Sequence, residues 1–437
     1  MAIILFAAVP KAHATDGHFL HGVGAINSAM GGAGIAAPVS ILGTFYLNPA
    51  GLMAFDGTRM EFSMEMFKAD RSVGSTFGPF TGSTSSKKDW VPIPAFGGTY
   101  KLNSERVVLG ISGLGIGGFG VDYPAENQPT NGGTNPILFP QPNGFGQVFS
   151  NYSLLNGTPS VAWAASDKLW LGASFKFAWA SLTIIPAPVG APDSDPGTPP
   201  TPAYFPQAGA SDGAFGWGFS GGLLYHVNDM IALGGSYTTE QQFSSFQWNS
   251  THANPNLANF GEPRTIEFQM NVPAVAGAGI AIQAMPSLLL TGDFKYYFYE
   301  STEGFSVPDT GPFNADGSVA GFAWTNIYSI ATGLKLDVSP LVALYGGYNY
   351  SQNPIPDEWA MINVPAPAIV QSHATLGVGI RPTRHLEITL GYYRAFENSG
   401  TGPIYGPAGP IPNTSVTNTL SEDSFQLMFS YGSRGQI

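Results

Sequence analysis

The chain contains no cysteine among its 437 residues. A disulfide framework, a thiolate nucleophile and a cysteine-ligated metal are therefore excluded. Charged residues are also scarce, at 11% of the chain, whereas about 25% is usual in soluble domains. So few charges could hardly cover the surface of a soluble protein of this length. A protein that presents half of its side chains to lipid does not need more of them.

The chain also has few basic residues and no long apolar run. Lys and Arg number only 17, and the formal net charge is −12. Nucleic acid is therefore excluded as a partner, because phosphate binding requires clustered basic residues. No uninterrupted apolar run reaches the roughly 18 residues of a transmembrane helix, so we expect no membrane-spanning helix.

The N-terminus has the pattern of an export signal. Residues 2–9, AIILFAAV, are an apolar run, and 12-AHA-14 is a small-x-small cleavage pattern. We predict a signal peptide over residues 1–14, with a short buried helix as the alternative. An exported, charge-poor chain without membrane helices is typical of an outer-membrane β-barrel.

Alternation of apolar and polar residues with a period of two supports the barrel. In 170–184, one face of the expected strand carries Leu171, Ala173, Phe175, Phe177 and Trp179, and the other carries Gly172, Ser174, Lys176 and Ala178. The same alternation recurs in 386–394 and in 265–272, where Ile266, Phe268, Met270 and Val272 share a face. Since charges are so few, we interpret the apolar faces as lipid-facing.

About fourteen such segments can be distinguished, near 59–69, 91–102, 106–115, 158–166, 168–184, 214–227, 230–248, 264–284, 287–301, 323–337, 341–351, 370–381, 385–397 and 423–432. Short connections alternate with long ones, such as 116–157, 185–213 and 398–422, as in barrels with tight periplasmic turns and long extracellular loops. Aromatic residues near the strand ends fit interfacial girdles: Trp179, Tyr225, Tyr237, Tyr296, Phe298, Tyr350, Tyr392, Tyr393 and Tyr431. We predict an all-β fold, a transmembrane antiparallel β-barrel of about 14 strands over residues 59–437.

Residues 15–58 do not have a strand pattern. They are rich in small residues and poor in charge, so we expect an N-terminal hatch that plugs the lumen, with a disordered periplasmic tail as the alternative. The hatch ends in the turn 45-FYLNPAGLMAF-55. Asn48 can bond to backbone, Pro49 ends a helix, and small Ala50 permits close packing. We interpret these three residues as the hatch anchor.

The order of these features resembles a known family. A signal peptide, then Met30–Gly34 (MGGAG), then Asn48–Leu52 (NPAGL) before the first strand is similar to the FadL/TodX/OmpP1 family of outer-membrane transporters. The stretches 90-WVPIPAFGG-98 and 353-NPIPDEW-359 also look similar. The resemblance implies a fourteen-stranded barrel with a lumen hatch. It also implies uptake of long-chain fatty acids or related hydrocarbons.

Two further features acquire roles from this resemblance. It implies a kink in the third strand that opens the wall laterally, which we place at Gly113, Gly115, Gly117 and Gly118, because glycine in a strand marks a bulge or close approach. A glycine-rich strand end is the alternative. The apolar loop 116–157, with Phe145 and Phe149, is expected to form an outer capture groove, or else a packed cap.

A fatty-acid carboxylate would require a basic partner in the lumen. The inward-facing candidates are Lys176, Lys335 and Arg381, and Lys176 is preferred because it has no acidic neighbour in sequence. Lys295 shares its face with Asp293, which we expect to neutralise it. In the hatch, His18, Phe19 and Leu20 are expected to touch the ligand, move and open a path.

Two other function classes compete with the channel. A general porin needs a charged constriction, for which basic residues are few. A barrel-wall lipase needs Ser and His placed for nucleophilic attack, but the seven His residues are scattered. We therefore predict a non-enzymatic, passive, ligand-gated channel without cofactor or metal. Its partners would be hydrophobic small molecules, outer-membrane lipid and lipopolysaccharide, and it would act as a monomer in the bacterial outer membrane.

Overall fold

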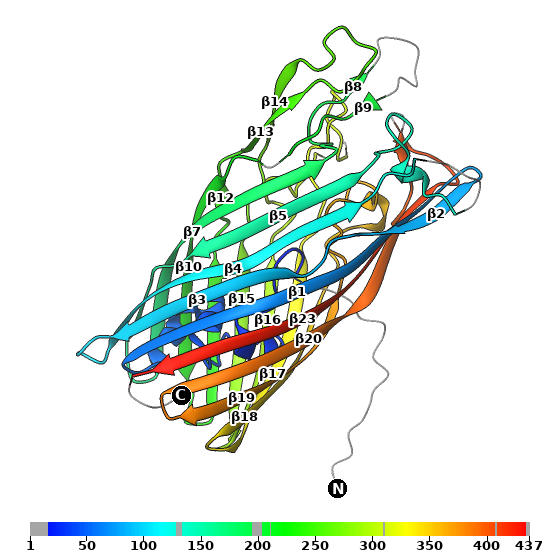
Figure 1. The fold of residues 1–437 in the computed structure, drawn as a ribbon. Coiled ribbons are helices and arrows are strands. Elements are labelled where there is room, and N and C mark those ends of the chain that lie inside the picture. The colour runs from blue at the N-terminus through cyan, green and yellow to red at the C-terminus, as the bar shows by residue number, and fades with distance from the viewer. Residues whose placement is uncertain are drawn as a thin grey trace.

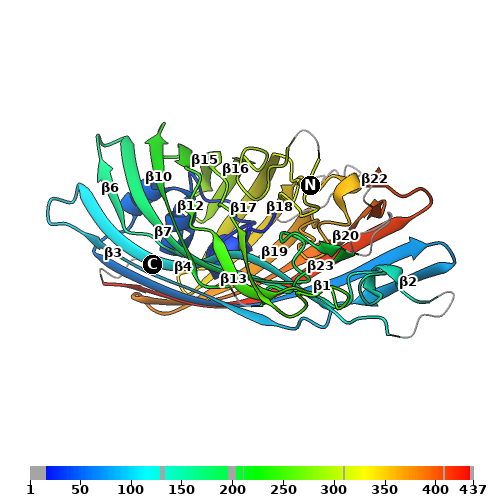
Figure 2. The same cartoon turned by 90° about the horizontal axis from the view of Figure 1, so that it is seen from above.

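The computed structural model describes residues 16–127, 133–194, 203–209, 211–308, 311–406 and 409–433. The expected signal peptide, residues 1–14, lies outside them. Within them the chain forms a closed antiparallel barrel of 14 wall strands, so the predicted fold class is confirmed. The last strand pairs with the first from Arg59–Gly432 to Thr76–Ser415, which closes the wall. Figure 1 shows the barrel from the side, and Figure 2 shows it from above.

The wall is a succession of neighbouring antiparallel strands. It consists of β1 (Thr58–Phe77), β3 (Val91–Lys101), β4 (Val107–Tyr123), β5 (Val148–Gly157) continued by β6 (Ser160–Ala164), β7 (Leu169–Ile185), β10 (Ala214–His226), β11 (Ile231–Thr238), β15 (Val275–Met285), β16 (Leu288–Tyr297), β17 (Ile327–Ser339), β18 (Val342–Ser351), β19 (Ser372–Thr383), β20 (Leu386–Gly402) and β23 (Ser415–Gly432). β5 and β6 pair with the same neighbours, β4 and β7, and form one wall strand.

The remaining strands extend the wall or belong to the long loops at one end of the barrel (Figure 1). They are β2 (Phe80–Ser85), β8 (Asp193–Ser194), β9 (Ala203–Tyr204), β12 (Gln242–Phe243), β13 (Phe246–Thr251), β14 (Pro263–Phe268), β21 (Tyr405–Gly406) and β22 (Gly409–Pro410). Two 3₁₀ turns, η2 (Pro136–Leu138) and η3 (Asp357–Trp359), lie in the same loops.

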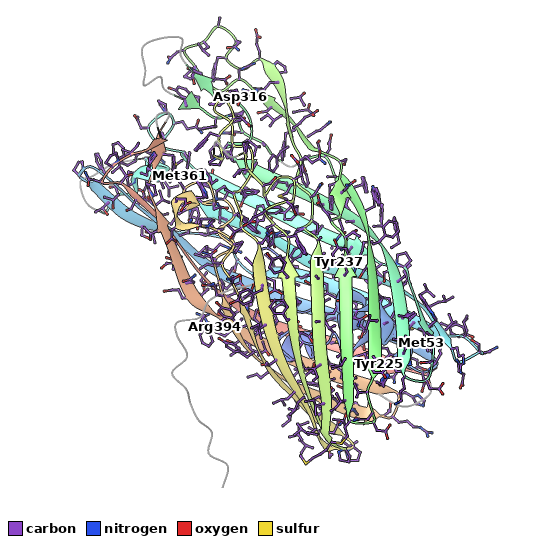
Figure 3. The ribbon with its side chains drawn as sticks, turned by 180° about the vertical axis from the view of Figure 1, so that it is seen from behind. Met53, Tyr225, Tyr237, Asp316, Met361 and Arg394 are labelled. Atoms are coloured by element: carbon purple, nitrogen blue, oxygen red, sulfur yellow. The ribbon has the colours of Figure 1, made fainter. Side chains whose placement is uncertain are left out.

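Side-chain alternation in the wall follows the predicted parity. In β7, Phe175 and Phe177 are 40% and 50% exposed, whereas Lys176 between them is 3% exposed. In β1 the exposed apolar side chains run from Met60 to Met66, and the Lys68–Asp70 ion pair lies above them. An apolar outer band bounded by charge is what a bilayer requires. Tyr225 and Tyr237 lie on this outer surface (Figure 3).

Two assignments of face were wrong. Ile266, Phe268, Met270 and Val272 are all buried and do not face lipid. They lie in β14 and the segment after it, which pack over the lumen; Pro273 cannot donate to a strand ladder, and β15 begins only at Val275. Tyr393 is also no girdle residue, because it is buried and donates a hydrogen bond to Glu65.

Several loop and strand boundaries also differ from the prediction. The expected loop 116–157 is much shorter, since β4 continues to Tyr123 and β5 begins at Val148. The loop 398–422 likewise shrinks, because β20 runs to Gly402 and β23 starts at Ser415. The expected strands 230–248 and 264–284 each break into pieces, and β13 and β14 pair with each other as a separate hairpin. Wall strands thus extend past the membrane band, where their sequence loses its apolar alternation.

The segment 16–57, called the hatch below, fills the lumen near the short-turn end (Figures 1 and 2). It contains α1 (Ala25–Ala29), α2 (Ile41–Leu47) and the 3₁₀ turn η1 (Pro49–Ala54). α1 packs against β18, β19, β20 and β23, α2 against β1, β3 and β4, and η1 against β6, β7 and β10. The hatch therefore touches the wall around most of its circumference. Within the described ranges, none of the helices has the length and apolar content needed to span a bilayer.

Candidate functional site

A cavity of ≈ 50 Å³ lies between the hatch and the wall. The hatch contributes Phe19, Ile35, Tyr46 and Leu47, and the wall contributes Ile116, Lys176, Val275, Lys295 and Tyr297 among others. A dry cavity that binds benzene in another protein measures about 150 Å³. The space beside the hatch in this structure is therefore too small for even a single aromatic ring.

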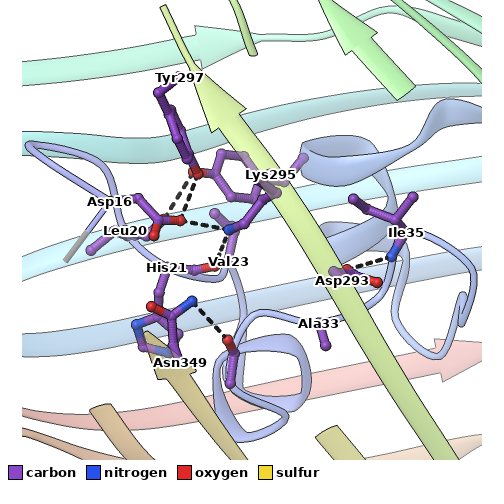
Figure 4. Close-up of polar contacts among 12 residues, drawn as sticks. Asp16, Leu20, His21, Val23, Ala33, Ile35, Asp293, Lys295, Tyr297 and Asn349 are labelled. Atoms are coloured by element: carbon purple, nitrogen blue, oxygen red, sulfur yellow. Dashed lines mark hydrogen bonds and ion pairs between the residues drawn. The ribbon is translucent and has the colours of Figure 1, made fainter. Parts of the chain in front are cut away.

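A buried ion pair fixes the beginning of the hatch. The carboxylate of Asp16 accepts hydrogen bonds from Lys295 Nζ at 2.5 Å and from the Tyr297 hydroxyl at 2.5 Å. Lys295 Nζ also donates to the backbone oxygen of His21. Figure 4 shows these contacts. The partner that neutralises Lys295 is thus Asp16, and the expected Asp293–Lys295 pairing is wrong.

Asp293, a wall residue in β16, binds the middle of the hatch. Its Oδ2 accepts hydrogen bonds from the backbone N–H groups of Gly34 at 2.7 Å and Ile35 at 2.9 Å. Figure 4 shows the bond to Ile35. Further along, Glu61 Oε2 accepts from Ser40 Oγ and from the N–H of Leu42 at the start of α2. Wall carboxylates therefore satisfy hatch amides that would otherwise be buried without partners.

The sequence motif Asn48-Pro49-Ala50 ends α2 and begins η1. Asn48 Nδ2 donates to the backbone oxygens of Ile35 and of Leu223 in β10, and its Oδ1 accepts from the N–H of Ala50. The motif thus links two parts of the hatch to the wall. Gly222 gives it room, since a Cβ there would lie 1.9 Å from Asn48 Oδ1.

The start of the hatch pairs with β4 at a β-bulge in the wall, called the fault below. The register between β4 and β5 shifts between Gly115 and Gly117. At this fault the N–H of Leu20 donates to Ile116 O, and the N–H of Gly118 donates to His18 O. A Cβ on Gly117 would lie 2.4 Å from His18 O, so glycine permits this approach. Gly113 lies below the fault, beside the ring of Phe96.

The three candidate basic residues occupy different surroundings. Lys176 is buried in the cavity wall, where its Nζ donates to the backbone oxygen of Phe45 at 3.2 Å. No acidic partner lies within ion-pair distance of it among the described residues. Arg381 instead forms ion pairs with Asp337 and Glu387, and Lys335 lies 3.5 Å from Asp337. Only Lys176 borders the cavity of the three.

The four apolar candidate residues also lie in different places. Phe19 lines the cavity, and Leu20 contributes its backbone to the pairing with β4. Phe145 packs in an outer-loop cluster with Ile137, Leu138 and Val148, as in the alternative of a packed cap. Phe149 lies under Lys88, whose Nζ is 4.9 Å from its ring centroid.

Comparison with known proteins decides the family. A family model for outer membrane protein transport proteins (OMPP1/FadL/TodX) matches residues 12–402. The chain belongs to this family. It is therefore an outer-membrane protein that transports hydrophobic compounds and is not an enzyme. In such barrels the short turns are periplasmic and the long loops extracellular.

Solved structures share the fold of this OMPP1/FadL/TodX member. The toluene transporter TodX of P. putida has a TM-score of 0.66 at 18% identity, covering 94% of this chain and 99% of that one. A Pseudomonas aeruginosa FadL homologue has 0.69 at 15%, covering 95% and 99%. The Ralstonia pickettii toluene transporter TbuX has 0.61 at 16%, covering 93% and 98%. The comparison with curated protein sequences finds no match.

A cluster of aromatic residues that lies next to the hatch is not predicted from the sequence. His18 lies among aromatic rings on its extracellular side: Tyr152, Tyr299, Phe305 and Trp324, with Phe322 beside the last two. Four of these five rings, Tyr299, Phe305, Phe322 and Trp324, come from the loop between β16 and β17, part of which was predicted as strand. The available signal was that loop's aromatic content, which is unusual for a solvated loop.

Proposed function

We propose that this transporter takes up long-chain fatty acids or related hydrocarbons by passive, ligand-gated diffusion. The cavity beside Phe19 is the observation that carries the proposal. It is bounded by apolar and polar side chains, among them the two buried lysines Lys176 and Lys295, and it is too small for a ligand while the hatch is docked. An incoming apolar molecule gains about 25 cal/mol per Å² buried there. If the ligand can bind only when Phe19 and Leu20 are displaced, this binding free energy stabilises the open state of the hatch.

The exit that we propose is lateral, through the fault in β4. Pairing between β3 and β4 ends at Ala95–Leu114, just before the register shift at Gly115–Gly117. On the lumen side the fault is covered by the backbone of residues 18–20. Movement of these residues would free the hydrogen-bonding groups of Ile116 and Gly118 and uncover the fault. Ligand would then pass into the surrounding lipid.

Lys176 suits a carboxylate head group, because it is buried at the cavity and bonds only to a backbone oxygen in the described structure. We therefore expect Lys176→Met to reduce oleate uptake about tenfold to a hundredfold, since a hydrogen bond to a charged group contributes about 1.5–3 kcal/mol. Toluene uptake should stay within about twofold, because toluene has no charge to bind. Lys335→Met is the matched control, since Lys335 lies outside the cavity. Equal loss of both solutes would contradict the role of Lys176 in recognising a carboxylate.

The proposal is tested by uptake in a Gram-negative host that lacks its own fatty-acid transporter. Cells expressing the protein should take up oleate or toluene, while a small sugar should not pass. Sugar passage alone would support a general porin, and ester hydrolysis without passage would support an enzyme. The protein should act as a monomer surrounded by outer-membrane lipid and lipopolysaccharide, which cross-linking in cells would show as a single-chain band.

A further inference from the structure

Two histidines of the hatch are buried with their basic nitrogens unpaired. The Nε2–H of His21 donates to the backbone oxygen of Ser28 at 3.1 Å. Its Nδ1 is therefore the nitrogen that could bind a proton, and in the described structure no hydrogen-bond partner reaches it. His21 is 1% exposed, and its ring lies 4.7 Å from that of His373 in β19.

His18 has the opposite tautomer, and its basic nitrogen also lacks a hydrogen-bond partner among the described residues. The Tyr299 hydroxyl donates to the backbone oxygen of Asp16, so its oxygen accepts from Nδ1–H of His18 at 3.4 Å. Nε2 of His18 is then the basic nitrogen, and it too has no partner among the described residues. The ring is stacked on Phe305 at 5.2 Å. A proton on either histidine would create a buried cation without an acceptor.

The charged groups nearby do not remove this cost. Asp16 favours a proton on His21, but Lys295 and His373 oppose it, and burial outweighs all three. One carboxylate oxygen of Asp16 is already held by Lys295 and Tyr297. The other titratable groups around the two rings are Tyr152, Tyr299, Tyr393, His373, Glu65 and Glu422. Glu65 accepts from Tyr393 and Ser424, and Glu422 lies 3.8 Å from Nε2 of His373.

We propose that acid releases the first part of the hatch, residues 16–24, because His18 and His21 can be protonated only after they leave their docked positions. Residues 16–24 carry the pairing with β4 and the Asp16 anchor, so their release opens the lumen even without a ligand. Asp293 and Glu61 hold the later parts of the hatch and are not needed for this step. The inference goes beyond the proposed function and does not depend on which solute is carried.

The direction of the pH effect follows from burial. Burial lowers the pKa of both His18 and His21 from 6.5 to about 3 in the docked hatch. Both groups bind protons more strongly when undocked, so docking is strongest above about pH 6.5 and weakens as the pH falls toward 3. Each imidazole shifts the equilibrium up to about tenfold per pH unit, and the two together up to about a hundredfold.

The test is small-ion conductance of the purified protein in planar bilayers. Between about pH 5.5 and pH 4.5, the open fraction of the wild type should rise by up to about a hundredfold. The double variant H18N/H21Q, whose amides keep the two donated hydrogen bonds, should lose from this rise the share of the two imidazoles, up to about a hundredfold. His385→Gln, which alters a turn histidine outside the lumen, should leave the rise intact. All carboxylates remain in these variants, so the difference isolates the two imidazoles.

A pH-independent open fraction in the wild type would overturn the inference, and so would an unchanged rise in the double variant. If the double variant fails to insert, His21→Gln alone decides. Its rise should fall to about tenfold per pH unit, the share of one imidazole, and an undiminished rise would count against the inference. Ion conductance does not depend on uptake of any hydrophobic solute, so failure of the proposed function would leave this result decidable.

Discussion

Replacing Gly222 with valine is expected to unseat the hatch while the barrel wall stays folded. A Cβ at Gly222 would lie 1.9 Å from Asn48 Oδ1, so Asn48 must leave its place. It would lose its bonds to Ile35, Leu223 and Ala50. Each buried group left unsatisfied costs about 1–3 kcal/mol, so the docked state should weaken by several kcal/mol in total. The resting conductance to small ions should rise at least about tenfold.

The neighbouring glycine provides the matched control. Gly221 points to the opposite face of β10, and a Cβ there would meet no atom within 4 Å. Gly221→Val should therefore conduct like the wild type, although it makes the same chemical change one residue away. Electrophoresis of unheated samples should show both variants as folded barrels. Equal conductance of the two variants would contradict the seating of Asn48 against β10.

Removal of the Asp16 carboxylate is expected to have the second large effect. Asp16→Ala leaves the buried ammonium of Lys295 without its counter-ion, and breaking one side of a buried pair costs about 3–5 kcal/mol. The first part of the hatch should then be released in a large fraction of molecules. Resting conductance should rise by about two orders of magnitude or more, within the limit set by full opening.

The double variant D16A/K295M separates loss of the anchor from the cost of an unpaired charge. Without the lysine charge nothing is left buried and unpaired, so the double variant should leak less than Asp16→Ala alone. The stability of the wall, followed by thermal unfolding, should change little in either, because the wall ladder is intact. A double variant that leaks more than the single one would refute the pairing as the source of the effect.

The barrel could be predicted because its signal is local. Membrane strands alternate lipid-facing and lumen-facing residues, so a stretch such as 170–184 reveals its own faces. The same local information failed at 265–272, where an equally regular alternation packs over the lumen. Alternation identifies two faces but does not say what covers them. Here Pro273 marks the difference, because it has no N–H to donate to a neighbouring strand and interrupts the hydrogen-bond ladder before β15.

The candidate site could be predicted only in part, because its contacts are distant in sequence. The turn chemistry at Asn48 predicts an anchor for the hatch, but the acceptor of its hydrogen bond, the backbone of Leu223, could not be deduced. Parity correctly placed Lys295 and Asp293 on one face, yet Lys295 pairs with Asp16, 279 residues away. Local pattern gives the direction of a side chain. Its partner depends on how the hatch is seated in the lumen.

Hydrogen exchange of the hatch, with and without ligand, tests the central claim most directly. The amide of Leu20 bonds to Ile116 O, and the amide of Gly118 bonds to His18 O. On addition of saturating oleate or toluene, both amides should exchange at least about tenfold faster, while the amide of Leu42, held by Glu61, should keep its protection. Unchanged protection of Leu20 and Gly118 in the ligand-saturated protein would contradict gating by displacement of the hatch.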